Sequence, residues 1–207
     1  MKKHRQRGKI IGFILLILLI SSGIIGRRLY NYIYDENFLV VQKENPFLYI
    51  PANSTFDEVC TSLVEAGLID AASFRWVAGK MNYKDKVKSG RYRLTDGMNN
   101  IELVRMLRSG RQIHVKVIFN NIRLNTQLAG AVTATIEADS ASVMALLTDS
   151  AYLAEKFKLT PQTVLSLFIP NTYEFFWNTS AMGFMERMSR EYDRFWTERR
   201  LQKARDA

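Results

Sequence analysis

The chain has 207 residues, of which 47% are hydrophobic and 24% charged, with only 4 Pro and 11 Gly. This composition predicts a folded protein and excludes a disordered chain or a collagen-like repeat. The formal net charge is +9, but seven of the basic residues lie within the first 28 positions, where no acidic residue occurs. Because the basic excess sits at one terminus beside an apolar run, and not across a folded face, we expect no nucleic acid partner.

Residues 1–34 are predicted to form a basic cytoplasmic tail followed by a transmembrane anchor. The run from Ile10 to Gly26 holds 17 residues without a charge, and as a helix it extends about 25 Å, slightly less than a hydrocarbon core. Tyr30, Tyr32 and Tyr34 follow it and suit the headgroup layer. Five Lys or Arg precede the run and two follow it. This predicts a single-pass protein of the cytoplasmic (inner) membrane, with its amino terminus inside and the bulk of the chain outside.

A cleaved signal peptide is the alternative, because Ile10 to Ile20 has the length of an apolar signal region and the small residues Ser21-Ser22-Gly23 follow it. The apolar residues that resume at Ile24, and the two arginines after them, favour the anchor. Both interpretations export the rest of the chain. The single cysteine, Cys60, cannot form an intramolecular disulfide, and we expect it to be a small buried residue on a helix.

The exported part is predicted to begin with a polar linker over residues 35–46 and to continue as a β-α-α-β-α module over residues 47–111. Ser54 is the expected N-cap, and Asp57 the N3 residue, of an amphipathic helix that ends at Gly67. The other expected elements are a strand over 46–51, a helix over 71–81, a strand over 91–94, and a helix that begins after Asn99 or Asn100 and ends at Ser109-Gly110.

Residues 112–207 are predicted to form a second, mixed α/β region, so that the whole chain has an α+β fold. Apolar and polar residues alternate from Ile113 to Phe119, which predicts a strand with one buried face. Helices are expected from Asn125 or Thr126 to about Thr133, over 140–147 and 152–157, and as one long final helix from Met182 to about Ala204.

The histidine count limits the possible chemistry. Only His4 and His114 occur, which excludes a multi-histidine metal site and disfavours a Ser-His-Asp or Cys-His catalytic set. The scattered glycines form no phosphate-binding loop. We therefore expect no metal and no cofactor, and we expect His114 to be an isolated histidine of the surface or core.

One segment, residues 167–177, has an unusual composition. Two apolar blocks flank a polar quartet that follows Pro170, and a single carboxylate, Glu174, lies between Tyr173 and three consecutive aromatic residues. A carboxyl group enclosed by such side chains would keep its proton near neutrality, as a general acid requires. The alternative is an ordinary strand-edge glutamate beside aromatic residues that belong to the core.

The order of these features resembles the YceG-like endolytic murein transglycosylases, some of which carry the label aminodeoxychorismate lyase. The block Phe168 to Phe175, F-I-P-N-T-Y-E-F, is similar to the F-P-D-T-Y-E-F block of that family, with Asn171 in place of Asp and Ile169 inserted before the proline. The other matching pieces are the membrane anchor, the Tyr49-Ile50-Pro51 opening, the sequence Gly90 to Leu94 and the helix end Leu107 to Gly110.

The resemblance implies a fold and a function. Residues 47–111 would be a LysM-like subdomain in contact with glycan, and residues 112–207 the N-terminal part of a catalytic domain. The implied reaction cleaves the MurNAc-GlcNAc β-1,4 bond of nascent glycan strands and leaves 1,6-anhydro-MurNAc ends, without a cofactor. Glu174 would be the catalytic residue, with Asn171, Thr172 and Tyr173 as substrate-binding residues. Peptidoglycan glycan strands and the cytoplasmic membrane are the expected partners, with peptidoglycan synthases as a further expectation.

Two departures from the family pattern leave a second function open. The family's catalytic glutamate stands five residues before the proline, where this chain has Leu165. The family continues with an Ala-Ser-Ile-Val-Glu-type segment and an Asp-Pro-Thr motif, and neither occurs here. We therefore expect the 207 residues to be part of a longer protein. The alternative function is a non-catalytic glycan-binding or synthase-associated module of the cell wall, so whether this chain is itself an enzyme stays open.

Overall fold

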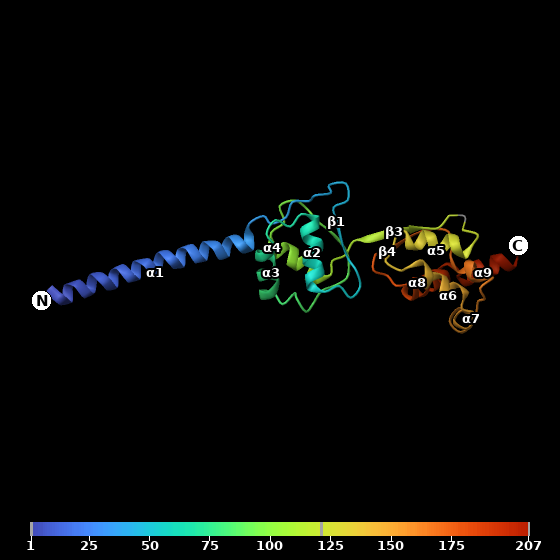
Figure 1. Ribbon diagram of the computed structural model, residues 1–207. Coiled ribbons are helices and arrows are strands. Elements are labelled where there is room, and N and C mark those ends of the chain that lie inside the picture. Colours follow the sequence, from blue (N-terminus) through green and yellow to red (C-terminus); the bar gives the residue numbers. More distant parts are fainter. Residues whose placement is uncertain (1, 121, 207) are drawn as a thin grey trace. The chain divides into compact units, whose positions relative to one another are not determined.

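A computed structural model describes residues 2–120 and 122–206, with side chains from Phe13 onward. It divides the chain into two compact units, which we describe separately. Unit 1 comprises Met1–Leu48, Ser54–Lys88 and Arg93–Arg111, and unit 2 comprises Tyr49–Asn53, Ser89–Tyr92 and Gln112–Ala207. Helices and short strands are combined in the chain (Figure 1), which confirms the expected α+β class.

Unit 1 begins with the long helix α1, Lys2–Tyr34. Its segment Phe13–Tyr34 is long and apolar enough to cross a membrane, by length and composition. Three further helices follow, α2 (Phe56–Ala66), α3 (Ala71–Lys80) and α4 (Asn100–Ser109). The strands β1 (Phe47–Ile50) and β2 (Gly90–Arg93), most of whose residues belong to unit 2, pair as a two-stranded sheet. The element order after α1 is thus the predicted β-α-α-β-α.

Local capping signals determine where the helices of unit 1 begin and end. The N-cap of α2 is Thr55, one residue beyond the expected Ser54, because the Thr55 hydroxyl accepts from the Glu58 backbone N–H while the Glu58 carboxylate accepts from that of Thr55. Asn99 makes the equivalent capping box with Glu102 at α4, as the first of the two expected alternatives requires. Gly110 ends α4 in the left-handed region, at φ 72°.

The segment 35–46, which its polarity predicted to be a linker, packs on the rest of unit 1. Phe38 and Val40 are buried, and isolated bridges pair Glu36 with Asn99 and Phe38 with Leu68. Gly67, at φ 123°, lets the backbone pass close to Leu39, whose carbonyl oxygen would lie 1.7 Å from an added Cβ. Cys60 is buried in the same core, as expected, and this burial raises the pKa of its thiol.

Unit 2 is built around an antiparallel pair, β3 (His114–Ile118) and β4 (Thr172–Phe176). Between them lie α5 (Asn125–Thr133), α6 (Ser140–Thr148), α7 (Ser150–Phe157) and the 3-10 helix η1 (Val164–Leu167). The inner faces of the strands meet α5, α6 and α8 over one apolar core. Its centre is an aromatic cluster of Phe119, Phe168, Phe175 and Phe184.

The expected single helix over 182–204 is wrong, because the chain forms two helices there. Helix α8 covers Ala181–Phe195 and α9 covers Glu198–Arg205. Trp196 and Thr197 leave the helical conformation, and the Thr197 carbonyl accepts from the backbone N–H groups of Arg200 and Leu201, which starts a new helix. The apolar stripe of α8 faces the core as predicted, with Phe184, Met185 and Met188 fully buried.

Candidate functional site

The alternation of side chains along β4 determines which residues of the unusual segment 167–177 face the core. Tyr173 and Phe175 are buried, whereas Glu174 and Phe176 between and after them are exposed. Of the two alternatives for Glu174, the carboxyl enclosed by aromatic side chains is therefore wrong, and the residue lies on the exposed face of a strand. Its two sequence neighbours project to the opposite face of β4, and Phe176 is the aromatic residue of β4 that shares its face.

The outer face of the β3–β4 pair gathers the polar side chains of both strands. Lys116 is the cross-strand partner of Glu174, and His114 is the partner of Phe176. The His114 ring stacks on the Phe176 ring, with 4.4 Å between centroids and an interplanar angle of 21°. A hollow of about 160 Å³ opens beside them. It is lined by Glu174, His114, Phe175, Phe176, Thr179, Gly183, Arg187 and Arg190.

An aromatic and cationic surface continues from His114 within unit 2. Arg91 Nη1 donates to the His114 carbonyl oxygen at 3.2 Å, and its guanidinium lies 5.8 Å from the Tyr49 ring centroid. Tyr49 in turn meets Trp177 edge to face, at 5.1 Å between centroids. We call Tyr49, Arg91, His114, Phe176 and Trp177 the aromatic platform. Sequence analysis did not place Tyr49 and Arg91 in the site, although both lie in the motif pieces that carried the resemblance.

A second carboxylate borders the platform. Glu137 follows α5, and its Oε1 accepts from the backbone N–H of Ala52 at 2.6 Å. Its own backbone N–H donates to the Trp177 carbonyl at 2.7 Å, which holds it at the edge of the platform. No sequence pattern marks Glu137, because its position depends on two segments that lie far from it along the chain.

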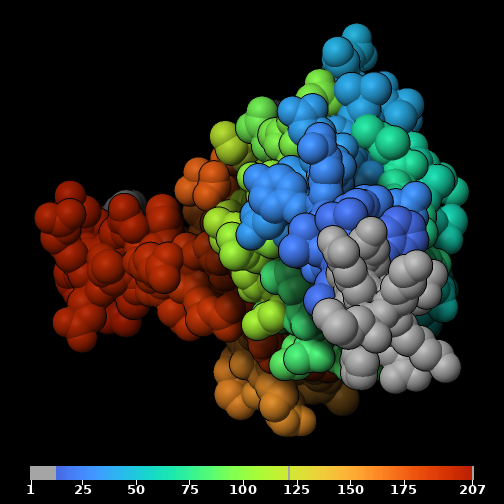
Figure 2. All heavy atoms as spheres, turned by 90° about the vertical axis from the view of Figure 1, so that its left-hand side faces the viewer, coloured from blue at the N-terminus to red at the C-terminus, as the bar shows by residue number. Residues whose placement is uncertain are grey.

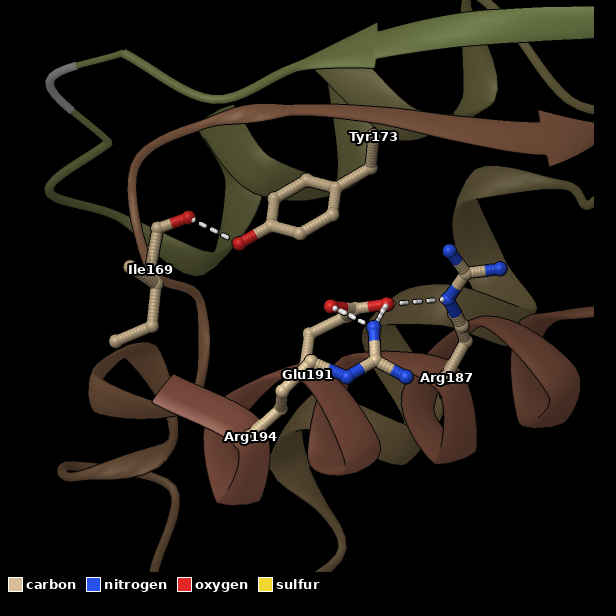
Figure 3. A network of polar contacts seen from close by, with 5 residues as sticks. All are labelled: Ile169, Tyr173, Arg187, Glu191 and Arg194. Carbon is tan, nitrogen blue, oxygen red and sulfur yellow. Dashed lines mark hydrogen bonds and ion pairs between the residues drawn. The ribbon is translucent and has the colours of Figure 1, made fainter. Parts of the chain in front are cut away.

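The three predicted substrate-binding residues differ in their exposure. Asn171 and Thr172 are exposed, and the Asn171 Oδ1 accepts from the Thr172 backbone N–H at 2.8 Å. The Tyr173 ring is buried, and its hydroxyl donates to the Ile169 carbonyl at 2.7 Å (Figure 3). Burial, with a smaller contribution from Glu191, raises the pKa of Tyr173. Tyr173 also lines a second hollow.

That second hollow lies at the carboxyl end of α8. It has a volume of about 180 Å³ and is lined by Ile169, Asn171, Tyr173, Glu191, Arg194, Phe195 and Arg200. The Glu191 carboxylate accepts from Arg187 Nε at 2.9 Å and from Arg194 Nη1 at 2.9 Å (Figure 3). Two guanidinium groups thus occupy the Glu191 carboxylate, whereas Glu174 is exposed on the outer face of β4.

Comparison with known families places these residues in context. The sequence model of the YceG-like family matches residues 48–207, which include the aromatic platform and Glu174. This chain belongs to the YceG-like family. A comparison with curated proteins finds no match. A solved structure similar to it is a protein described as YceG-like from Listeria monocytogenes, with 20% sequence identity and a TM-score of 0.40. The similarity covers 80% of this chain and 60% of that one, so the chain spans 60% of that protein's length.

Leu165 occupies the position at which the resemblance puts the catalytic glutamate of YceG-like proteins. It lies in η1, where it is half-buried and packed against the core of unit 2. The site of this YceG-like chain therefore holds an apolar side chain there, and a carboxylate stands nine positions later in β4. Among the residues that the structure describes, no three His, Cys, Asp or Glu side chains gather in a way that could hold a metal ion.

Proposed function

We propose that this YceG-like protein is a membrane-anchored peptidoglycan lytic transglycosylase. It cleaves the MurNAc-GlcNAc β-1,4 bond of nascent glycan strands and leaves 1,6-anhydro-MurNAc ends. The family match over residues 48–207 supports the reaction class. The observation that carries the assignment to a site is the position of Glu174, which is exposed on β4 and lines the same hollow as His114 and Phe176 of the aromatic platform.

The proposed reaction needs one carboxyl group, and Glu174 is the residue that we assign to it. Its protonated form donates a proton to the glycosidic oxygen, so that the bond to C1 of the muramic acid breaks and the alcohol leaves. The resulting carboxylate then accepts the proton of the muramic C6 hydroxyl, whose oxygen bonds to C1 and closes the anhydro ring. No water is consumed, which distinguishes this reaction from hydrolysis by paired carboxylates.

The aromatic platform and the two arginines suit the substrate that this reaction requires. Aromatic rings pack well on the apolar faces of sugar rings, and the exposed His114 and Phe176 stack lies beside Glu174 on the same surface. Arg190 lines the adjoining hollow, as does Arg187, whose Nε is already bonded to Glu191. Guanidinium groups bind carboxylates strongly, and a peptidoglycan strand carries carboxylates on its peptide stems.

The membrane location is part of the proposal. The apolar segment Phe13–Tyr34 supports a single-pass anchor, and the excess of basic residues before it supports an amino terminus inside the cell. We assign residues 47–111 a LysM-like role in holding the glycan strand. Peptidoglycan synthases, which produce nascent strands, are the proposed protein partners.

A non-catalytic glycan-binding or synthase-associated module is the second candidate. The observation that favours it is Leu165, which puts an apolar, half-buried side chain at the family's usual position for the acid. Under this alternative the aromatic platform binds glycan and Glu174 is an ordinary charged residue on an exposed strand face.

Digestion of purified peptidoglycan by the full-length protein separates the two candidates. Mass analysis of the released fragments should show 1,6-anhydro ends with the wild-type protein and none with Glu174→Gln. Glu155→Gln, which changes an exposed glutamate on α7, is the matched control and should cleave like the wild type. Retention on insoluble peptidoglycan without any anhydro product would support the binding module and contradict the enzyme.

A further inference from the structure

The end of α1 is joined to unit 1 by a buried polar network. Asn37, Ser73 and Asn100 are each no more than 5% exposed. The Asn37 side-chain amide donates to Asn100 Oδ1 at 2.7 Å and to Ser73 Oγ at 3.1 Å. Asn100 Nδ2 donates to the carbonyl of Tyr32 in the last turns of α1, at 2.7 Å. Because buried hydrogen bonds are costly to break, this network fixes α1 to α3 and α4.

This join places α3 beside the end of the apolar helix. Tyr32 on α1 meets Trp76 on α3 edge to face, with 6.5 Å between ring centroids. Figure 1 shows α3 and α4 at the end of unit 1 from which α1 emerges, and Figure 2 looks at the molecule from that side. The exposed face of α3 therefore lies on the side of unit 1 from which the span departs.

The length of the span sets the depth of this contact. Twenty helical residues cover the roughly 30 Å of a hydrocarbon core, and counted from Ile10 they reach Leu29. Tyr32 is three residues further, which is about 5 Å along the helix axis, and the headgroup layer is itself about 5 to 7 Å thick on each side. Trp76, in contact with Tyr32, lies at the same depth.

The side chains on this face of α3 suit a membrane surface. Ala72, Trp76 and Lys80 follow one another at intervals of four residues, and all three are exposed. The Lys80 Nζ lies 5.6 Å from the centre of the Trp76 ring. Tryptophan is enriched at the membrane interface, and lysine is attracted to anionic lipids there. The acidic Asp35 and Glu36 follow the end of α1 and line a hollow with Tyr32 whose lining does not include Trp76 or Lys80.

We propose that unit 1 rests on the outer headgroup layer of the membrane through the exposed face of α3. Trp76 enters the headgroup layer beside Tyr32, and Lys80 contacts the phosphates of anionic phospholipids. Arg27 and Arg28, in the last turn of the span before Leu29, extend their long side chains toward the same headgroup layer. The inference rests on the membrane span of the proposed function. It adds that unit 1 is held at the bilayer surface by a second contact and does not swing freely on its anchor.

Tryptophan fluorescence of the full chain in vesicles of phosphatidylcholine and phosphatidylglycerol tests this contact. Trp177→Phe and Trp196→Phe together leave Trp76 as the only tryptophan of the three in the chain. We expect lipids brominated close to the headgroup to lower its emission roughly twofold relative to unbrominated lipids, and lipids brominated at the chain ends to act less. Circular dichroism checks that the variant is folded.

A second tryptophan position separates failure of this inference from failure of the span. Tyr30→Trp, in a chain whose three native tryptophans are replaced by Phe, reports on α1 itself. Quenching at Tyr30→Trp without quenching at Trp76 would overturn the seating of α3 and leave the span intact. Quenching at neither position would overturn both the seating of α3 and the membrane span of α1.

A matched pair of charge reversals tests the part assigned to Lys80. In the chain that keeps only Trp76, Lys80→Glu should weaken the quenching in vesicles that contain phosphatidylglycerol. Lys43→Glu makes the same change of charge at an exposed position of unit 1 outside α3 and should leave the quenching as it was. Equal quenching in both variants would contradict a contact between Lys80 and anionic lipid.

Discussion

Lys116 and Glu174 are cross-strand partners on the exposed face of the β3–β4 pair. The register of the two strands keeps Glu174 outside the core, with Val117 and Phe175 on the buried face. A slip of the pairing by one residue would exchange the two faces and put a carboxylate among aromatic side chains. The apolar core of unit 2 thus positions the acid that the proposed function uses.

Glu174→Gln tests that assignment directly. The substitution keeps the size of the side chain but removes the proton that a general acid donates, so transglycosylase activity should fall by about 10² to 10⁴. Because Glu174 is exposed, the free energy of unfolding should change by no more than about 0.5 kcal/mol. Product analysis and denaturant unfolding measure the two effects. Full activity on purified glycan strands would remove Glu174 from the catalytic role.

Truncation of a core phenylalanine and of an outer-face phenylalanine of unit 2 should have different effects. Phe184 is fully buried and contacts three other aromatic rings, so Phe184→Ala should destabilise unit 2 by about 3 to 5 kcal/mol. Phe176 is 45% exposed and stacks on His114. Phe176→Ala should cost far less stability but weaken retention on insoluble peptidoglycan. Unchanged retention of a folded Phe176→Ala protein would argue against the aromatic platform as a glycan surface.

The buried asparagine network predicts a loss of rigidity at the end of α1. Asn37→Ala leaves the polar groups of Ser73 and Asn100 without one of their partners, which should cost about 1 to 3 kcal/mol. Limited proteolysis in detergent should then cleave near residues 35–41 sooner than in the wild type. Asn45→Ala, in an exposed turn of the same segment, serves as the control, and equal cleavage of both variants would count against the network.

Alkaline pH should destabilise the fold through its buried tyrosines. Burial raises the pKa of Tyr92 to about 12, whereas a tyrosine in the unfolded chain ionises near 10. The folded state therefore holds more protons between these values, and the free energy of unfolding should fall as the pH rises above about 10. Tyr92→Phe should make this fall shallower in unfolding curves measured at several pH values. An unchanged slope would show that Tyr92 does not govern it.

Membrane topology gives a further prediction. A periplasmic reporter fused after Tyr30 should be active outside the cytoplasmic membrane, because the basic residues that precede the apolar run keep the amino terminus inside. Sequencing of the mature protein should find its original amino terminus. A mature terminus near Gly23 or Ile24 would instead support the cleaved signal peptide.

Local patterns in the sequence were sufficient to predict most of the helices and strands. The alternation from Ile113 to Phe119, the cap at Asn99 and the stop at Gly110 each depend on residues within a turn or two, and β3 and α4 formed where these patterns predicted. The block around Pro170 is likewise a run of adjacent residues. It indicated the family that the match over residues 48–207 then confirmed.

Tertiary structure decided the composition of the site, because contacts between distant segments have no local signal. The flanking aromatic residues left open whether Glu174 is enclosed or lies at a strand edge, because only the pairing of β4 with β3 determines which face of the strand is buried. Trp177 meets Tyr49, and Asn37 bonds to Asn100, across 63 positions in the latter case. Such contacts arise when the chain closes long loops around an apolar core, so their partners cannot be read from spacing alone.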